Sequence, residues 1–122
     1  MTIIEAINRI DSLHQNTYTQ EDKIAWLSEL DWDVKKNIID THEGNDDAFT
    51  GYDEATDLQR KLLIPEPFEK VYLLWLEAQI HYYNGEYEKY NNAREMFSTA
   101  FTGFQNHYNR THMPIGKKMK FF

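Results

Sequence analysis

The sequence contains no cysteine, few glycines and prolines, and no long hydrophobic run. Without cysteine there is no disulfide framework, no thiolate ligand for zinc and no cysteine nucleophile. The longest apolar run, residues 71 to 76, is far shorter than the roughly 20 residues that a membrane-spanning helix needs. The start of the chain also lacks a basic region followed by an apolar stretch. We therefore expect a soluble, unsecreted protein in a reducing compartment.

Sequence signatures of catalysis are missing as well. The five histidines show no His-x-x-x-His or His-Glu-x-x-His spacing, so the sequence offers no scaffold for catalytic zinc. No glycine-rich phosphate loop and no Gly-x-Ser-x-Gly turn occurs. The acids between Asp40 and Asp47 resemble ligands for Ca²⁺ or Mg²⁺, but their order does not match an EF-hand loop. We expect no enzyme activity, no metal and no cofactor, and we interpret these acids as a solvated loop.

The residues that are present favour one domain with many aromatic contacts. A chain of 122 residues fits a single core, and its 15% of aromatic residues predicts a core or interfaces rich in rings. The net charge of −7 is uneven, because residues 1 to 66 carry 15 acids and 6 bases, whereas residues 67 to 122 carry 5 acids and 7 bases. The acidic half would repel nucleic acid, whose binding needs clustered lysine and arginine.

Hydrophobic periodicity predicts two helices in the first part of the chain. Thr2 and Glu5 form a capping box before the first helix, and Thr19 and Asp22 form an equivalent pair before the second. Isoleucines and leucines then recur at spacings of three and four residues. We place these helices at about residues 3 to 14 and 20 to 41.

Two further helices are predicted in the second half. We expect the third helix to begin at Glu66-Pro67, because proline at the first helical position loses no needed hydrogen bond. Asn84-Gly85 predicts a tight turn, although one continuous helix that tolerates a glycine is the alternative. The last helix ends before Pro114. The predicted fold is therefore all-α, with four helices.

A long acidic loop separates the second and third predicted helices, from Thr41 to Pro67. Loops of this length are uncommon in compact domains and are typically functional, or ordered only when bound. Residues 62 to 64, Leu-Leu-Ile, should anchor its far end on the core or form a short strand. The acids of this loop that are candidates for a functional contact are Glu43, Asp46, Asp47, Asp53, Glu54 and Asp57.

Aromatic residues gather on both sides of Asn84-Gly85. They are Trp75, Tyr82, Tyr83, Tyr87 and Tyr90. Their helical spacing favours a place in the core or in a subunit interface. Stacking on nucleic-acid bases is the alternative.

The last ten residues carry no acid and have the pattern of a strand. With a period of two, Ile115, Met119 and Phe121 fall on one side together with Lys117, and Lys118 and Lys120 fall on the other. Pro114 and Gly116 disfavour a helix. Fully extended, this tail would reach about 33 Å and could add a strand to the sheet edge of a neighbour. A frayed basic end, or a tail folded back on the acidic half, is the alternative. The predicted docking residues are Met113, Pro114, Ile115, Lys117, Lys118, Met119, Lys120, Phe121 and Phe122.

Two stretches carry a family resemblance: Ala-Gln-Ile-His-Tyr-Tyr-Asn-Gly-Glu-Tyr-Glu-Lys-Tyr-Asn-Asn from Ala78 to Asn92, and Tyr-Asn-Arg-Thr-His-Met-Pro from Tyr108 to Pro114. They resemble small structural proteins encoded among the head-morphogenesis genes of tailed phages and prophages of Gram-positive bacteria. These proteins are similar to head-tail connector, or adaptor, proteins. The first eight residues and Phe49-Thr-Gly-Tyr-Asp53 agree, so the resemblance covers nearly the whole chain.

The resemblance implies a virion protein of the neck, assembled in the host cytoplasm. Such adaptors form a ring, usually of twelve copies, that binds the portal, bridges it to the next neck protein (the stopper) and extends the DNA channel. The DNA passes without specific binding, and no membrane, cofactor or catalytic residue is implied. Residues 1 to 112 would form the helical adaptor domain, and residues 113 to 122 would dock on the portal. Another neck or tail component, such as a stopper or tail terminator, and a small phage DNA-binding protein are the alternatives.

Overall fold

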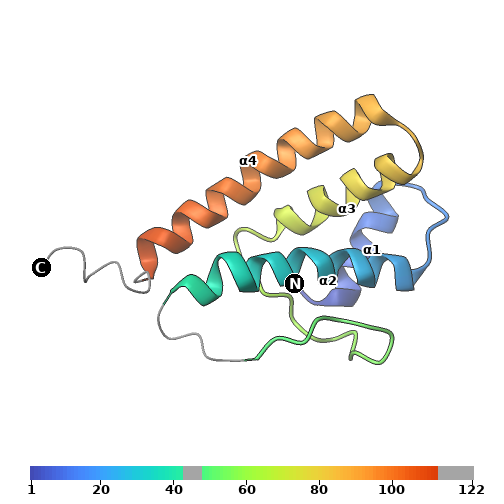
Figure 1. Ribbon diagram of the computed structural model, residues 1–122. Helices are drawn as coiled ribbons and strands as arrows, with labels where there is room; N and C mark the ends of the chain where they lie inside the picture. Colours follow the sequence, from blue (N-terminus) through green and yellow to red (C-terminus); the bar gives the residue numbers. More distant parts are fainter. Residues whose placement is uncertain (43–47, 113–122) are drawn as a thin grey trace, which may run out of the picture.

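The structure is a computed structural model that describes residues 1 to 42 and 48 to 112 (Figure 1). The described residues form four α-helices and no strand, so the predicted all-α class is confirmed. The helices are α1 (Ile3–Leu13), α2 (Gln20–Asn37), α3 (Lys70–Tyr83) and α4 (Tyr87–Thr111), with a short 3-10 helix, η1 (Ile39–Thr41), after α2.

Both predicted capping boxes are present. The Thr2 hydroxyl accepts a hydrogen bond from the backbone N–H of Glu5 at 3.2 Å, and the Glu5 carboxylate accepts one from the N–H of Thr2 at 3.1 Å. Thr19 and Asp22 make the same two bonds at the start of α2. Because these bonds satisfy backbone donors that a helix leaves free, the first residues of α1 and α2 follow directly from the sequence.

Two predicted helix boundaries are wrong. α2 ends at Asn37 rather than near residue 41, and the residues that follow tighten into η1. α3 begins at Lys70 rather than at Pro67, because the N–H of Phe68 bonds the carbonyl of Pro65 at 2.9 Å and closes a separate turn. The Phe68 ring then packs on Phe104 of α4, with ring centroids 5.7 Å apart. A tertiary contact therefore sets where this helix starts.

The helices are arranged around α3, which contacts each of the other three. The tight turn predicted at Asn84-Gly85 is confirmed, and Gly85 has a φ of 78°, a conformation that glycine adopts without strain. α4 therefore runs back along α3 (Figure 1). The α3–α4 turn lies at the same end of the molecule as the α1–α2 connection, and the C-terminal ends of α2 and α4 lie at the other (Figure 1).

The described part of the loop, residues 48 to 69, is packed on the core rather than extended into solvent. Phe49, Tyr52, Leu62 and Ile64 are buried, which confirms that residues 62 to 64 anchor the loop. No strand forms among the described residues there. Apolar side chains therefore fix both ends of this described segment.

Backbone hydrogen bonds also tie this loop to the N-terminus. The N–H of Ile3 bonds the carbonyl of Arg60 at 3.0 Å, and the N–H of Leu62 bonds the carbonyl of Met1 at 2.9 Å. Thr2 and Lys61, which lie between these hydrogen-bonded residues, form an isolated antiparallel β-bridge. The loop thus covers the start of α1.

Gly51 allows the loop to approach α2 closely. Its φ is 81°, and a Cβ atom at this position would lie 2.6 Å from Nε1 of Trp32 and 2.9 Å from Oγ of Ser28. The next residue, Tyr52, donates its N–H to Oγ of Ser28 at 2.9 Å. A side chain at residue 51 would therefore push the loop away from α2.

A buried carboxylate joins the loop to two helices. Asp31 of α2 is 0% exposed and accepts hydrogen bonds from the Tyr52 hydroxyl at 2.5 Å, the Leu63 N–H at 3.1 Å and the Tyr72 hydroxyl at 2.7 Å. The Tyr72 hydroxyl also accepts a bond from the N–H of Ile64 at 2.6 Å. Burial raises the pKa of Asp31 above its usual range, although these donors lower it in part.

We expect Asp31→Asn to lower the free energy of unfolding by about 2 to 4 kcal/mol at low pH and by less near neutral pH, because its amide NH₂ would face one of three donors. Since burial raises the pKa of Asp31, the folded state holds this proton more tightly than the unfolded state. The contribution of Asp31 to stability is therefore largest at low pH and is lost as the pH rises through the raised pKa. Denaturant unfolding at several pH values should show the cost of Asp31→Asn shrinking toward neutral pH.

The matched control for this prediction is Asp33→Asn, which changes an exposed acid on the same helix. It should change the free energy of unfolding by no more than about 0.5 kcal/mol. An Asp31→Asn protein as stable as this control would contradict the role of the buried carboxylate.

Candidate functional site

Four aromatic side chains meet at the α3–α4 turn. Tyr82 and Tyr83 end α3, and Tyr87 and Tyr90 lie in the first turn of α4. The Tyr82 ring contacts the other three, with centroids 5.1, 6.4 and 5.3 Å away. Tyr82, Tyr83 and Tyr87 are 48%, 57% and 62% exposed, respectively. We name these four residues the tyrosine surface, because clustered exposed rings are typical of protein interfaces.

The tyrosine surface rests on rings from the other end of the sequence. Trp26 of α2 is buried and stacks on Tyr83, with centroids 5.5 Å apart and an interplanar angle of 9°. Tyr18, in the α1–α2 connection, contacts both rings and donates its hydroxyl hydrogen to Oδ1 of Asn84 at 2.6 Å. Because the rings are already held in place, a partner that binds them would lose little conformational entropy.

Trp75, also predicted as an interface residue, does not lie with the tyrosines. Its Nε1–H donates to the carbonyl of Trp26 at 2.8 Å, and its ring contacts Phe97 of α4 at 5.1 Å. It is half-buried. Trp75 therefore packs α2, α3 and α4 against one another within the subunit.

The charges beside the tyrosine surface are mixed in sign. The Glu86 carboxylate accepts hydrogen bonds from Asn84, Lys89 and His81, which lower the pKa of Glu86 to about 2. Arg94 donates to the Tyr90 hydroxyl at 3.2 Å. Proteins that stack bases combine aromatic rings with a cationic groove along the phosphate backbone. Among the described residues, no such groove lies beside the tyrosine surface.

Three of the six candidate acids of the loop can be placed. Asp53, Glu54 and Asp57 are exposed. Asp53 and Asp57 also hold local turns, because their carboxylates accept bonds from the N–H groups of Ala55 and Gln59, both at 2.9 Å. The candidate acids Glu43, Asp46 and Asp47, and the docking tail from Met113 to Phe122, lie outside the described residues.

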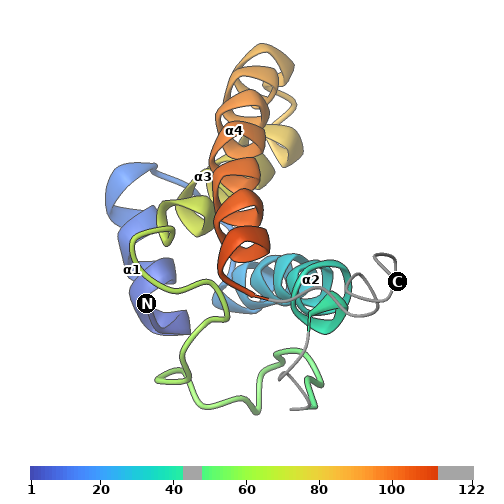
Figure 2. The same ribbon diagram turned by 90° about the vertical axis from the view of Figure 1, so that its left-hand side faces the viewer.

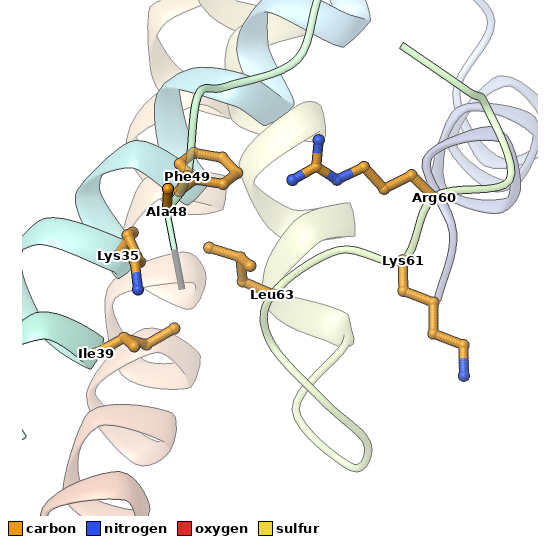
Figure 3. Close-up of a pocket in the computed structure, with 7 residues that line it drawn as sticks. All are labelled: Lys35, Ile39, Ala48, Phe49, Arg60, Lys61 and Leu63. Atoms are coloured by element: carbon orange, nitrogen blue, oxygen red, sulfur yellow. The ribbon is translucent and has the colours of Figure 1, made fainter. Parts of the chain in front are cut away.

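The structure also reveals a hollow that the sequence did not predict. It has a volume of about 280 Å³ and lies between α2 and the loop (Figure 3). Figure 3 shows the Arg60 side chain pointing toward Phe49, and its guanidinium carbon lies 5.7 Å from the centroid of that ring. Lys35 is paired with Asp40 at 2.9 Å. The lining residues are Lys35, Ile39, Ala48, Phe49, Arg60, Lys61 and Leu63.

An apolar floor with cations at its rim suits an acidic or carboxylate-bearing segment of a partner. Lys35, Arg60 and Lys61 are half of the six bases in residues 1 to 66. Lys35 lies 25 positions before the adjacent Arg60 and Lys61, so only the folded loop brings the three around one hollow. No local sequence signal could have found it.

Comparisons of the chain with protein-family models, with characterised proteins and with solved structures found no match. In the part of the chain that the structure describes, no helix has both the length and the apolar character needed to cross a membrane. The surfaces of the domain therefore carry the functional interpretation.

We expect the double variant Tyr82→Ser with Tyr87→Ser to remain folded but to lose self-association. Both rings are largely exposed, so their removal takes away interface area without opening the core. Sedimentation velocity over a range of protein concentrations should show assemblies for the unchanged protein and monomers for the variant. Met96→Ser is the matched control, because Met96 is 53% exposed on α4 outside the tyrosine surface. Equal assembly by all three proteins would show that the tyrosine surface is not a subunit contact.

Proposed function

We propose that this protein is an adaptor of a phage neck, a helical subunit that forms a ring on the portal and joins it to the next neck component. The resemblance of the stretches Ala78 to Asn92 and Tyr108 to Pro114 to connector proteins supports this function. The observation that carries it is the position of two contact elements at opposite ends of α4. The tyrosine surface lies at its first turn, and the predicted docking tail follows its last residue.

The length of α4 makes these two ends distinct. With 25 residues the helix is about 37 Å long. Contacts at one end would close a ring of subunits, while the tail at the other end would reach a different protein. A subunit built in this way can hold two neighbours in a fixed relation, which is what an adaptor does.

The C-terminal end of α4 is a firm base for the tail. The buried His42 ring, just after η1, contacts the Tyr108 ring at 4.7 Å, and the Tyr108 ring stacks on His112 at 3.8 Å. Figure 2 shows this end of α4 beside the end of α2. His112, the last described residue, is therefore held in a fixed position.

In the proposed attachment the tail adds to an exposed sheet edge of the portal. Main-chain hydrogen bonds would give affinity, and the apolar side chains of Ile115, Met119 and Phe121 would fill pockets. Lys117, Lys118 and Lys120 would meet carboxylates of the partner. Repetition around a ring would convert modest contacts into a stable attachment.

We expect a protein lacking residues 113 to 122 to fold as the full chain does, because the described hydrophobic core consists of residues between Ile3 and Tyr108. It should no longer join portal rings. Co-sedimentation with purified portal measures this directly, and circular dichroism checks that the shortened protein is folded. A tail in which Lys117, Lys118 and Lys120 are changed to Gln is the matched variant, and it should bind portal more weakly and with less dependence on salt. Unchanged co-sedimentation of the shortened protein would overturn the docking role.

The acidic loop has a proposed role in the DNA channel. Residues 1 to 66 have 15 acids and 6 bases, and a ring would repeat this charge in every subunit. If the exposed acids Asp53, Glu54 and Asp57 face the channel, they repel the phosphates of passing DNA and keep it from sticking. A contact with the next ring is the alternative role for the same residues.

We expect the variant with Asp46→Asn, Asp47→Asn, Asp53→Asn and Glu54→Gln to slow DNA release from assembled heads while still joining the next ring. Ejection triggered in vitro and followed by the amount of DNA released over time provides the measurement. Glu88→Gln with Glu95→Gln, two exposed acids of α4, is the control. Normal ejection together with a lost next-ring contact would assign the loop to that contact instead.

A further inference from the structure

Two histidines and a glutamate that are far apart in the sequence come together between α1 and α3. His14 is the C-cap of α1, and Glu77 and His81 lie on one face of α3, four residues apart. One ring nitrogen of each histidine and a carboxylate oxygen of Glu77 lie within 4.8 Å of one another. The sequence predicted no metal because it contains no local ligand motif, and this set is completed only when α1 packs on α3.

The distances are close to those of a metal site. Zinc binds imidazole nitrogen and carboxylate oxygen at about 2.0 to 2.2 Å, so neighbouring ligand atoms of a tetrahedral ion lie about 3.3 Å apart. Nε2 of His14 now lies 2.5 Å from Oε1 of Glu77, so an ion would have to separate this pair by less than about 1 Å. His14 stands where the chain leaves α1, and its backbone is already extended. It can therefore shift without disturbing a helix.

A second carboxylate supports His81 from behind. Nδ1 of His81 lies 3.2 Å from Oε1 of Glu86, which leaves Nε2 of His81 for an ion. Glu86 is itself held by Asn84 at 3.0 Å and Lys89 at 3.1 Å. Histidines that bind metals commonly donate their other ring N–H to a carboxylate, which fixes the tautomer and makes the ligand more basic. An isolated ion pair between His14 and Glu77 would not require this arrangement.

The cluster is open to an ion from solvent. The side chains of His14, Glu77 and His81 are 33%, 21% and 14% exposed. His14 and Glu77 also line a hollow of about 250 Å³ whose other walls include Ile10, Leu73 and Met96. An ion held by the three side chains would have a remaining coordination position for water.

We propose that His14, Glu77 and His81 form a binding site for a divalent transition metal of the zinc type. Two imidazoles and one carboxylate select such an ion over Ca²⁺ and Mg²⁺, which prefer oxygen ligands. Glu86 acts as a positioning residue for His81. The bound ion links the end of α1 to α3 and stabilises the helical domain. This site does not depend on the proposed adaptor role.

The test uses the tag-free full chain and Zn²⁺ in isothermal titration calorimetry, with Co²⁺ as a spectroscopic probe of the ligand set. We expect one ion per chain and a Co²⁺ visible spectrum typical of nitrogen and oxygen ligands. Glu77→Gln keeps a hydrogen-bond acceptor for His14 but removes the charged ligand, and it should weaken binding by at least about 100-fold. His81→Ala should do the same, and Glu86→Gln should weaken binding about tenfold or more.

Two further measurements separate this site from other imidazoles. His112→Ala removes an exposed histidine outside the cluster and should leave the affinity unchanged. Lowering the pH from about 7.5 to about 5.5 should weaken binding, because protons compete with the ion for imidazole. Absence of Zn²⁺ binding by the unchanged protein, or full affinity in Glu77→Gln, would overturn the proposal. Loss of binding in His112→Ala with full affinity in His81→Ala would place the ion elsewhere and overturn it equally.

Discussion

The hydrogen bonds of Asp31 hold together parts of the chain that no helix connects. The donors Tyr52, Leu63 and Tyr72 stand 21, 32 and 41 positions away in the sequence. Burying a carboxyl group costs stability unless it is hydrogen-bonded, so these partners stabilise it together. These hydrogen bonds consequently join the loop, α2 and α3, and α3 is the helix that contacts each of the other three.

The features proposed to be functional all depend on the position of α3. Its last turn carries His81 together with Tyr82 and Tyr83 of the tyrosine surface, and the turn before it carries Glu77. The α3–α4 turn connects the histidine cluster with the tyrosine surface. Glu86 in this turn lies at hydrogen-bond distance from His81, and it is also the N-cap of α4, which carries Tyr87 and Tyr90. An ion bound by His14, Glu77 and His81 would therefore also stiffen the support beneath the tyrosine surface.

Local patterns in the sequence predicted the features that short-range interactions determine. Thr2, Thr19 and Asn84-Gly85 fixed helix starts and a turn because their hydrogen bonds and backbone preferences act over a few residues. The start of α3 was misplaced, because the packing of Phe68 on another helix overrides the preference of Pro67. The sequence did not predict the hollow beside Lys35 and Arg60 or the cluster of His14, Glu77 and His81. Each brings together residues that are far apart in the sequence and form no local motif. Gly51 belongs to the stretch Phe49 to Asp53. In the structure its missing side chain allows the loop to pack closely against α2.

α4 combines a buried stripe with an exposed aromatic end on one continuous helix. Ala93, Phe97, Phe104 and Tyr108 are buried, while Tyr87 is largely exposed. Each residue added to an α-helix rotates everything beyond it by about 100°. A single insertion between Tyr90 and Phe97 would therefore swing the tyrosines to another side of the molecule even if every core contact survived. Within this helix, only substitutions, or insertions of about seven residues that nearly restore the phase, would leave the tyrosine surface in place.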